Sequence, residues 1–169
     1  MQKILLLAGD FTEDYETMVP FQALSMLGYQ VDAVCPGKKA GEFIKTAIHD
    51  FEGDQTYTEK PGHLFKLTKT FDEVDFDEFD MVVLPGGMPG TLNLKEHEGL
   101  RNLIGEFDKK KKYLAAICAA PSILSELGIL KGRKACAYPS FEEGLDCAQV
   151  VHEAAVTDGH VTTGRGMGA

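Results

Sequence analysis

The sequence predicts an α/β protein with an open, doubly wound, mostly parallel sheet and helices on both of its faces. Three largely apolar runs, 4–8, 80–84 and 113–117, are typical of central strands that are buried on both sides. Each run is followed by a turn and a helical pattern, so strand and helix alternate along the chain. Because crossovers between parallel strands share one hand, we expect Ala8, Leu84 and Ile117 to end their strands along one edge.

Local signals define the other elements. The first helix is expected over about 16–27 and is closed by Gly28, and the second strand is expected over 31–35 before Pro36-Gly37. Residues 38–70 mix polar and isolated apolar residues, which indicates an excursion of two or three short strands. The expected elements that remain are a helix over about 95–110, a helix from Cys118 to near Gly128, a strand over 134–138, and a hairpin of 154–157 with 160–163.

Size and charge limit the classes of function. With 169 residues the chain is expected to form a single domain over 1–169. The net charge of −9 speaks against nucleic acid or an anionic membrane as the main partner. The four cysteines, Cys35, Cys118, Cys136 and Cys147, form no CxxC pair, so reduced thiols in a cytoplasmic setting are expected. No stretch is long and apolar enough for a secretion signal or a membrane span.

Cys118 lies where the strand in YLAAICAAPSIL, residues 113–124, turns at once into a helix. At such a bend the side chain stands clear of the sheet, and unpaired N–H groups of the helix face it. The sequence therefore predicts a cysteine with a lowered pKa, acting as a nucleophile or an oxidant sensor. The alternative is a buried packing cysteine. The alanines on both sides and Pro121 favour the tight elbow.

Two further features are expected at the same edge of the sheet. Glu16 opens the first helix, and Gly86-Gly87 follows the strand that ends at Leu84. A carboxylate beside a thiol can exchange protons with it or with a substrate, and glycine amides can approach a developing oxyanion. The alternatives are a helix-start acid for Glu16 and an ordinary tight turn for the two glycines.

Four segments resemble the ThiJ/PfpI superfamily, which is also called the DJ-one superfamily: EDYETMVP (13–20), LPGG (84–87), AAICAAP (115–121) and TTGRGMG (162–168). The resemblance covers essentially the whole chain. It implies a flavodoxin-like fold of the class I glutamine-amidotransferase type. It also implies a homodimer that needs neither a metal nor an organic cofactor.

The resemblance also assigns residues to roles. It implies that Cys118 is the nucleophile, that Glu16 is its carboxylate partner, and that the backbone N–H groups of Gly87 and Ala119 stabilise an oxyanion. The residues expected to line the substrate pocket are Gly86, Tyr138, Arg165 and His49.

The chain departs from several branches of that superfamily. Ala119 stands where the protease-like and plant glyoxalase-like branches carry a histidine, so their Cys-His-Glu triad is absent. Tyr138 stands where parkinsonism-type members often present a histidine, yet residues 49–63 resemble the protease and plant branch. The chain ends at Ala169, where an apolar helix normally follows. We therefore expect an incomplete sequence or a partly bare sheet face.

The function expected from these residues is a cofactor-independent cysteine enzyme that acts on small reactive aldehydes or glycated substrates, in the manner of glyoxalase III and deglycase members. Cys118 would add to the aldehyde of methylglyoxal or to an early glycation adduct, and Glu16 would move the proton. The alternative is an oxidative-stress sensor or chaperone in which Cys118 is oxidised to the sulfinic acid. A peptidase or amidase is disfavoured by the missing histidine.

Overall fold

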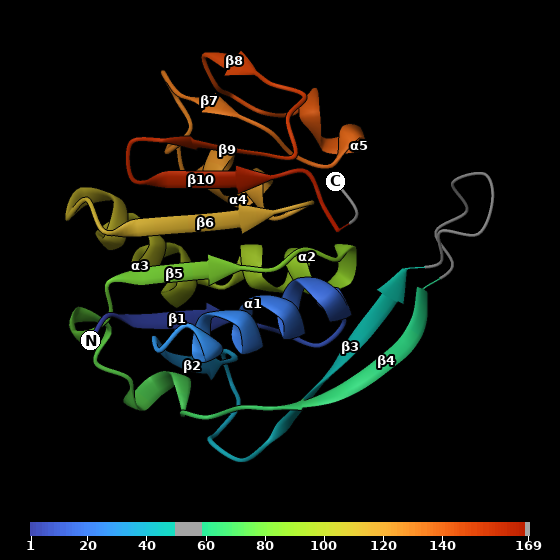
Figure 1. Ribbon diagram of the computed structural model, residues 1–169, viewed down its shortest axis with the longest axis vertical. Coiled ribbons are helices and arrows are strands. Elements are labelled where there is room, and N and C mark those ends of the chain that lie inside the picture. The colour runs from blue at the N-terminus through green and yellow to red at the C-terminus, as the bar shows by residue number, and fades with distance from the viewer. Residues whose placement is uncertain (50–58, 168–169) are drawn as a thin grey trace.

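The computed structural model describes residues 1–49 and 59–167. Its main sheet has six strands in the order β2-β1-β5-β6-β10-β9 (Figure 1). The strands of this sheet are β1 (Lys3–Leu7), β2 (Gln30–Val34), β5 (Met81–Leu84), β6 (Tyr113–Ile117), β9 (Ala155–Asp158) and β10 (Val161–Gly164). All neighbours in the sheet pair in parallel except β9 and β10, which form the predicted antiparallel hairpin. The predicted fold class is therefore confirmed.

Helices cover both faces of this sheet. The helix α1 (Asp14–Met26) packs on one face, and α2 (Met88–Glu96), α3 (Glu98–Lys109) and α4 (Pro121–Glu126) pack on the other (Figure 1). Alternate side chains of β1 serve the two faces: Leu5 and Leu7 belong to the core under α3, while Ile4 and Leu6 belong to the core under α1. This double burial explains why the strand is a continuous apolar run.

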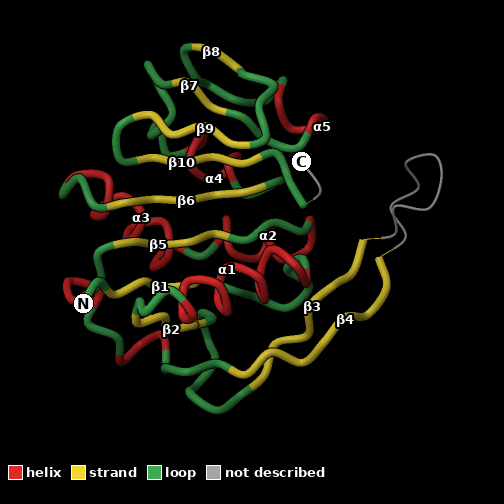
Figure 2. The backbone as a smooth tube through the Cα atoms, in the orientation of Figure 1, coloured by secondary structure: helices red, strands yellow, loops and turns green. Residues whose placement is uncertain are grey.

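The excursion predicted over 38–70 is a hairpin of β3 (Phe43–His49) and β4 (Glu59–Lys66), which extends away from the main sheet (Figure 2). The hairpin is fixed near its middle, where the N–H of Ala47 donates to the carbonyl of Thr12 at 2.8 Å. Residues 50–58, which form most of the segment 49–63 singled out in the sequence, lie outside the described residues.

One helix was missed and one strand prediction is wrong. The helix expected over about 95–110 is present as α3, but α2 was not expected. His97 separates the two helices, because it has extended backbone angles and caps α3 by accepting the N–H of Leu100 at 3.2 Å. The strand expected over 134–138 shortens to β7 (Lys134–Ala135), which pairs with β8 (Gln149–Val150) in a separate small sheet. Residues after Ala135 do not continue the strand. The N–H of Tyr138 donates to the carbonyl of Cys118 and not to a neighbouring strand.

Three short helices were not foreseen from the sequence: η1 (Phe71–Glu73), η2 (Phe76–Glu78) and α5 (Pro139–Glu142). Proline occupies the first turn of α5, where its fixed φ suits a helix start and its missing N–H costs nothing.

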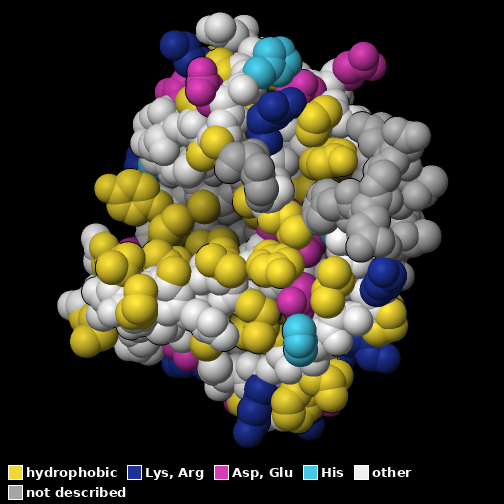
Figure 3. All heavy atoms as spheres, turned by 45° about the vertical axis from the view of Figure 1, so that its right-hand side comes forward, with side chains coloured by type: hydrophobic (Ala, Val, Ile, Leu, Met, Phe, Trp, Pro, Cys, Tyr) yellow, Lys and Arg dark blue, Asp and Glu magenta, His cyan; other side chains and the backbone are white. Residues whose placement is uncertain are grey.

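The face under α1 is open over β6. Tyr113 is exposed there, and Met81 and Ala115 are only partly buried. Figure 3 shows hydrophobic side chains in a hollow of the surface beside α1, and Ile4, Leu24 and Tyr113 are among the residues that line a pocket there. Within residues 1–49 and 59–167, no helix is long and apolar enough to cross a membrane.

Candidate active site

Cys118 occupies a strained bend directly after β6. Its φ of 63° lies in the left-handed region, which residues other than glycine rarely adopt. Two hydrogen bonds hold the bend: the N–H of Cys118 donates to the carbonyl of Gly164 at 2.9 Å, and its carbonyl accepts the N–H of Tyr138 at 3.0 Å. The tight elbow predicted from the sequence is therefore present, with the half-buried thiol at the carboxyl edge of the sheet.

Glu16 lies against this thiol from the first turn of α1. Its side chain is 3% exposed, and its Oε2 accepts the N–H of Gly86 at 2.8 Å. The N–H of Met167 and the thiol of Cys118 also donate to this carboxylate. Burial raises the pKa of Glu16 because it outweighs these hydrogen bonds, which favour the charged form. Glu16 is therefore suited to accept and return a proton.

Gly86 must be a glycine because there is no space for a side chain. A methyl group there would lie 2.5 Å from Oε2 of Glu16 and 2.7 Å from Cβ of Cys118. Gly87, with a φ of 93°, is equally restricted, since its methyl group would lie 2.7 Å from the backbone nitrogen of Glu13. The glycine turn thus lets the carboxylate and the thiol meet.

The prediction of a lowered pKa for Cys118 is wrong. Burial and the neighbouring Glu16 carboxylate together raise the pKa of the thiol to about 12, although the N–H groups of Ala119 and Gly87 lower it. The amides predicted to be oxyanion donors thus act on the sulfur itself, where they favour the thiolate. A proton that moves from the sulfur to the Glu16 carboxylate leaves the total charge of the buried pair unchanged, and the raised pKa of Glu16 favours its accepting that proton.

Tyr138 and Arg165 border this pair in different ways. A methyl group at Gly166 would lie 3.6 Å from the Tyr138 ring, 3.8 Å from Oε1 of Glu16 and 4.0 Å from Cβ of Cys118. The structure therefore brings the Tyr138 ring close to Glu16 and Cys118, and its role in a substrate pocket stays a prediction. The guanidinium of Arg165 instead pairs with a carboxylate of α5, since its Nε lies 3.3 Å from Oε1 of Glu142.

His49 ends β3 on the side of the strand that carries Ala47. The backbone of Ala47 forms a parallel bridge with Glu13, so this end of β3 lies beside the start of α1. Both ring nitrogens of His49 are buried without a hydrogen-bond partner in the described structure. The pocket role of His49 stays a prediction, since no contact between His49 and Cys118 is found among the described residues.

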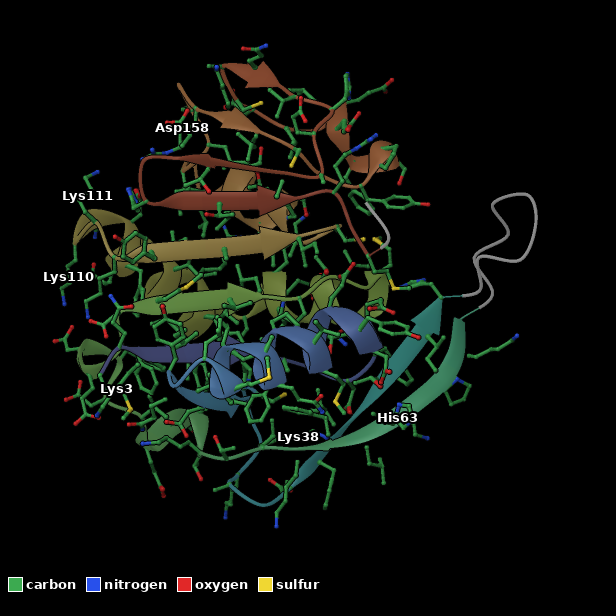
Figure 4. The ribbon with its side chains drawn as sticks, viewed as in Figure 1. Lys3, Lys38, His63, Lys110, Lys111 and Asp158 are labelled. Carbon is green, nitrogen blue, oxygen red and sulfur yellow. The ribbon has the colours of Figure 1, made fainter. Side chains whose placement is uncertain are left out.

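A second network joins the β3–β4 hairpin to α1. The hydroxyl of Thr46 donates to Asp14, and Nδ1 of His63 lies 3.0 Å from Oδ1 of the same carboxylate. His63 reaches from β4 toward α1 (Figure 4). These bonds lower the pKa of Asp14, so this carboxylate is charged at neutral pH. The hairpin is thereby fixed to the helix that carries Glu16.

Three residues of the site were missed in the sequence: Glu13, Gly166 and Met167. Gly166 and Met167 lie within the segment 162–168 that was singled out in the sequence, but their proximity to Glu16 depends on where β10 ends. Glu13 is wholly buried and caps α1, although it reads as one residue of an acidic loop. Among the described residues, no group of three or more His, Cys, Asp or Glu could hold a metal ion.

Comparison with known proteins identifies the family. The model of the DJ-1/PfpI family matches residues 2–169. The chain belongs to the DJ-1/PfpI family. Protein DJ-1 homolog D of Arabidopsis thaliana is 55% identical over 140 residues, which are 82% of this chain and 36% of that protein. Deglycase PfpI of Pyrococcus furiosus is 34% identical over 171 residues, covering 98% of this chain and 91% of that protein.

Solved structures of the DJ-1/PfpI family share this fold. Oxidized Toxoplasma gondii DJ-1 superposes with a TM-score of 0.83 at 23% identity, over 98% of this chain and 83% of that chain. The chain spans well under half of the Arabidopsis relatives that it matches, 36% of homolog D and 41% of homolog E.

Replacement of Gly86 by alanine is expected to separate Glu16 from Cys118, because the added methyl group cannot fit between them. We expect a loss of about 1–3 kcal/mol in unfolding free energy from overpacking. Activity at Cys118 should fall about 10²-fold, as reacting groups displaced by about 1 Å lose that factor. Urea unfolding and an activity assay measure both.

Gly105→Ala is the matched control for this substitution. Gly105 lies in α3, and its methyl group would meet nothing within 4 Å. This variant should gain about 0.5–1 kcal/mol in stability and keep its activity. Equal behaviour of the two variants would show that Gly86 is not needed for the contact between thiol and carboxylate.

Proposed function

We propose that the chain is a cofactor-independent cysteine enzyme that converts small reactive aldehydes such as methylglyoxal to hydroxy acids, or repairs early glycation adducts. The observation that carries the proposal is the buried contact between Cys118 and Glu16, framed by the N–H groups of Gly87 and Ala119. A nucleophile, a base with a raised pKa and two oxyanion donors are the groups that this reaction needs.

The first step forms a hemithioacetal. The Cys118 sulfur bonds to the aldehyde carbon of methylglyoxal while its proton passes to the Glu16 carboxylate. This coupling avoids a free thiolate, which the high pKa of Cys118 disfavours. The aldehyde oxygen becomes an alkoxide, receives hydrogen bonds from Gly87 and Ala119, and then takes the proton back from Glu16.

The second step is an isomerisation without net oxidation. The Glu16 carboxylate removes the hydrogen from the former aldehyde carbon, and the oxygen of the adjacent carbonyl takes up the proton of the hemithioacetal hydroxyl. Glu16 then returns its proton to the adjacent carbon, so that the former aldehyde carbon becomes the thioester carbonyl and the adjacent carbon carries the hydroxyl. The product is a thioester of Cys118 with lactic acid. Water then adds to the thioester carbonyl, the carbon–sulfur bond breaks, and lactate leaves with the thiol restored.

The relatives support this class of chemistry. Deglycase PfpI of Pyrococcus furiosus covers nearly the whole chain, and its name states a deglycase activity. The chain lacks a histidine after the nucleophile, so Glu16 must move every proton that leaves sulfur or carbon in the scheme. A peptidase would need a general acid for an amine leaving group, and Ala119 supplies none.

The rival is a sensor in which oxidation of Cys118 is itself the signal. One observation favours it: the same N–H groups of Gly87 and Ala119, together with a protonated Glu16, would hydrogen-bond the oxygens of a sulfinate. In that case oxidation would improve a property of the protein instead of ending an activity.

The test follows methylglyoxal consumption, lactate formation and the mass of Cys118 in one sample during titration with peroxide. We expect turnover by the reduced protein and a loss of turnover in proportion to sulfinate, because a sulfinate cannot add to an aldehyde. If the reduced protein forms no lactate while oxidation raises the melting temperature or creates chaperone activity, the sensor replaces the enzyme.

A further inference from the structure

Glu13 is a buried carboxyl that the proposed mechanism does not use. It is 0% exposed and lies between the glycine turn and the first turn of α1. Its backbone N–H donates to the carbonyl of Gly86 at 2.9 Å, and its Oε2 accepts the N–H of Glu16 at 2.8 Å. Glu13 therefore hydrogen-bonds the backbone of Gly86 and of Glu16, the two residues that are themselves joined by the bond from the Gly86 N–H to the Glu16 carboxylate.

Capping alone does not account for this side chain. The shorter residues Ser, Thr, Asp and Asn are the preferred helix N-caps, and one accepting atom is enough for the task. Here only Oε2 is used, whereas Oε1 is buried and has no hydrogen-bond partner in the described structure. A buried carboxylate oxygen without a donor favours the protonated form of the group.

The charge of Glu13 acts on its neighbours. Burial raises the pKa of Glu13 to about 7, and the charges of Glu16 and Asp14 raise it in addition, against the N–H groups that lower it. Glu13 in turn raises the pKa of Cys118 through its charge. This carboxyl therefore changes its charge near neutral pH within electrostatic reach of the reacting thiol.

The other titratable groups around Glu13 come from three elements. Glu16 and Asp14 lie on α1, Cys118 lies after β6, and His49 lies two residues along β3 from Ala47, whose backbone pairs with Glu13. Asp14 is held by His63 of β4, which keeps its charge in place at neutral pH.

We propose that Glu13 is a positioning residue that fixes Glu16 and Gly86 through its hydrogen bonds and sets, by its own charge, how readily Cys118 gives up its proton. Below neutral pH Glu13 is uncharged, and the thiol pairs with Glu16 alone. Above neutral pH a second buried negative charge opposes the thiolate. The inference rests on the proposed function only in naming Cys118 as the reacting group, and its test needs no aldehyde.

The test compares wild type with Glu13→Gln, which keeps an oxygen to cap Glu16 but has no charge to gain. The rate of Cys118 alkylation by iodoacetamide is followed by mass spectrometry from pH 5.5 to 8.5. The ratio of the variant rate to the wild-type rate should be near one at pH 5.5 and about threefold or more at pH 8.5. The control is Asp75→Asn, which alters the exposed N-cap of η2. Its ratio of variant rate to wild-type rate should be the same at every pH. A Glu13→Gln ratio that is the same at all pH values overturns the proposal, because a purely structural role would shift every rate alike.

Stability provides a second readout. A carboxyl whose pKa is raised on folding stabilises the protein fully below its unfolded pKa, and this contribution is lost as pH rises through the folded pKa. From pH 5 to pH 8, the unfolding free energy of wild type should therefore fall more than that of Glu13→Gln. Equal falls overturn the proposal.

A variant that does not fold leaves the proposal testable. The alkylation profile is then measured in Glu16→Gln, where Glu16 no longer titrates and Glu13 is intact. In a plot of the logarithm of the alkylation rate against pH, the slope should drop below one near pH 7, because Glu13 becomes charged there. A unit slope throughout overturns the proposal.

Discussion

Replacement of Cys118 by serine is expected to reduce methylglyoxal turnover to the rate without protein. The serine hydroxyl is of similar shape, so the elbow and its hydrogen bonds to Gly164 and Tyr138 should survive. An alcohol is a far weaker nucleophile than a thiol, and no base strong enough to activate it is present. Lactate formation by the purified variant, with circular dichroism to check the fold, measures the effect.

Cys147→Ser is the control for this substitution. Cys147 is also a free, half-buried cysteine, and it lies in the segment between α5 and β8, outside the site. Its variant should keep full turnover. Turnover above about a tenth of wild type in Cys118→Ser would remove Cys118 as the nucleophile, and the reaction would then need another covalent centre or none.

The fold could be predicted because its strands are marked by strong local signals. Apolar runs located β1, β5 and β6 within one or two residues, and Gly9 and Pro85 marked the ends of the first two. The helix α2 was missed, since its first turn carries Pro89 and Gly90, which are typical of a loop, and only the cap residue His97 separates it from α3. The fate of residues 134–138 depended on a long-range bond between Tyr138 and Cys118, which no local pattern encodes.

The sequence predicted which main residues form the site, but not the direction of the pKa shift at Cys118. Cys118, Glu16 and Gly86-Gly87 all follow from one topological rule, because the carboxyl ends of parallel strands meet at one edge. The sign of the pKa shift at Cys118 did not follow. A helix N-terminus lowers the pKa of a thiol that is partly exposed to solvent. At Cys118, burial and the neighbouring Glu16 carboxylate raise the pKa by more than the helix N-terminus lowers it.

Replacement of Glu16 by glutamine should lower turnover by about 10²–10⁴-fold, the usual contribution of a general acid or base. The glutamine oxygen can still accept the N–H of Gly86, so the site keeps its shape. The variant loses the group that takes the proton from sulfur and carries it between the two carbons. Lactate formation is measured across pH, with the surface variant Glu106→Gln as control.

The pH dependence separates this role from a helix-start acid. In wild type, turnover should fall as pH drops through the raised pKa of Glu16, because protonation removes the base. The variant should lack this acidic limb. The stability of wild type should change in the opposite sense. Because folding raises the pKa of Glu16, wild type loses stability as pH rises through the pKa of Glu16 in the folded protein, and Glu16→Gln does not. A variant with an unchanged rate and profile would leave Glu16 only its place in the first turn of α1, where the helix dipole favours an acid whatever the chemistry.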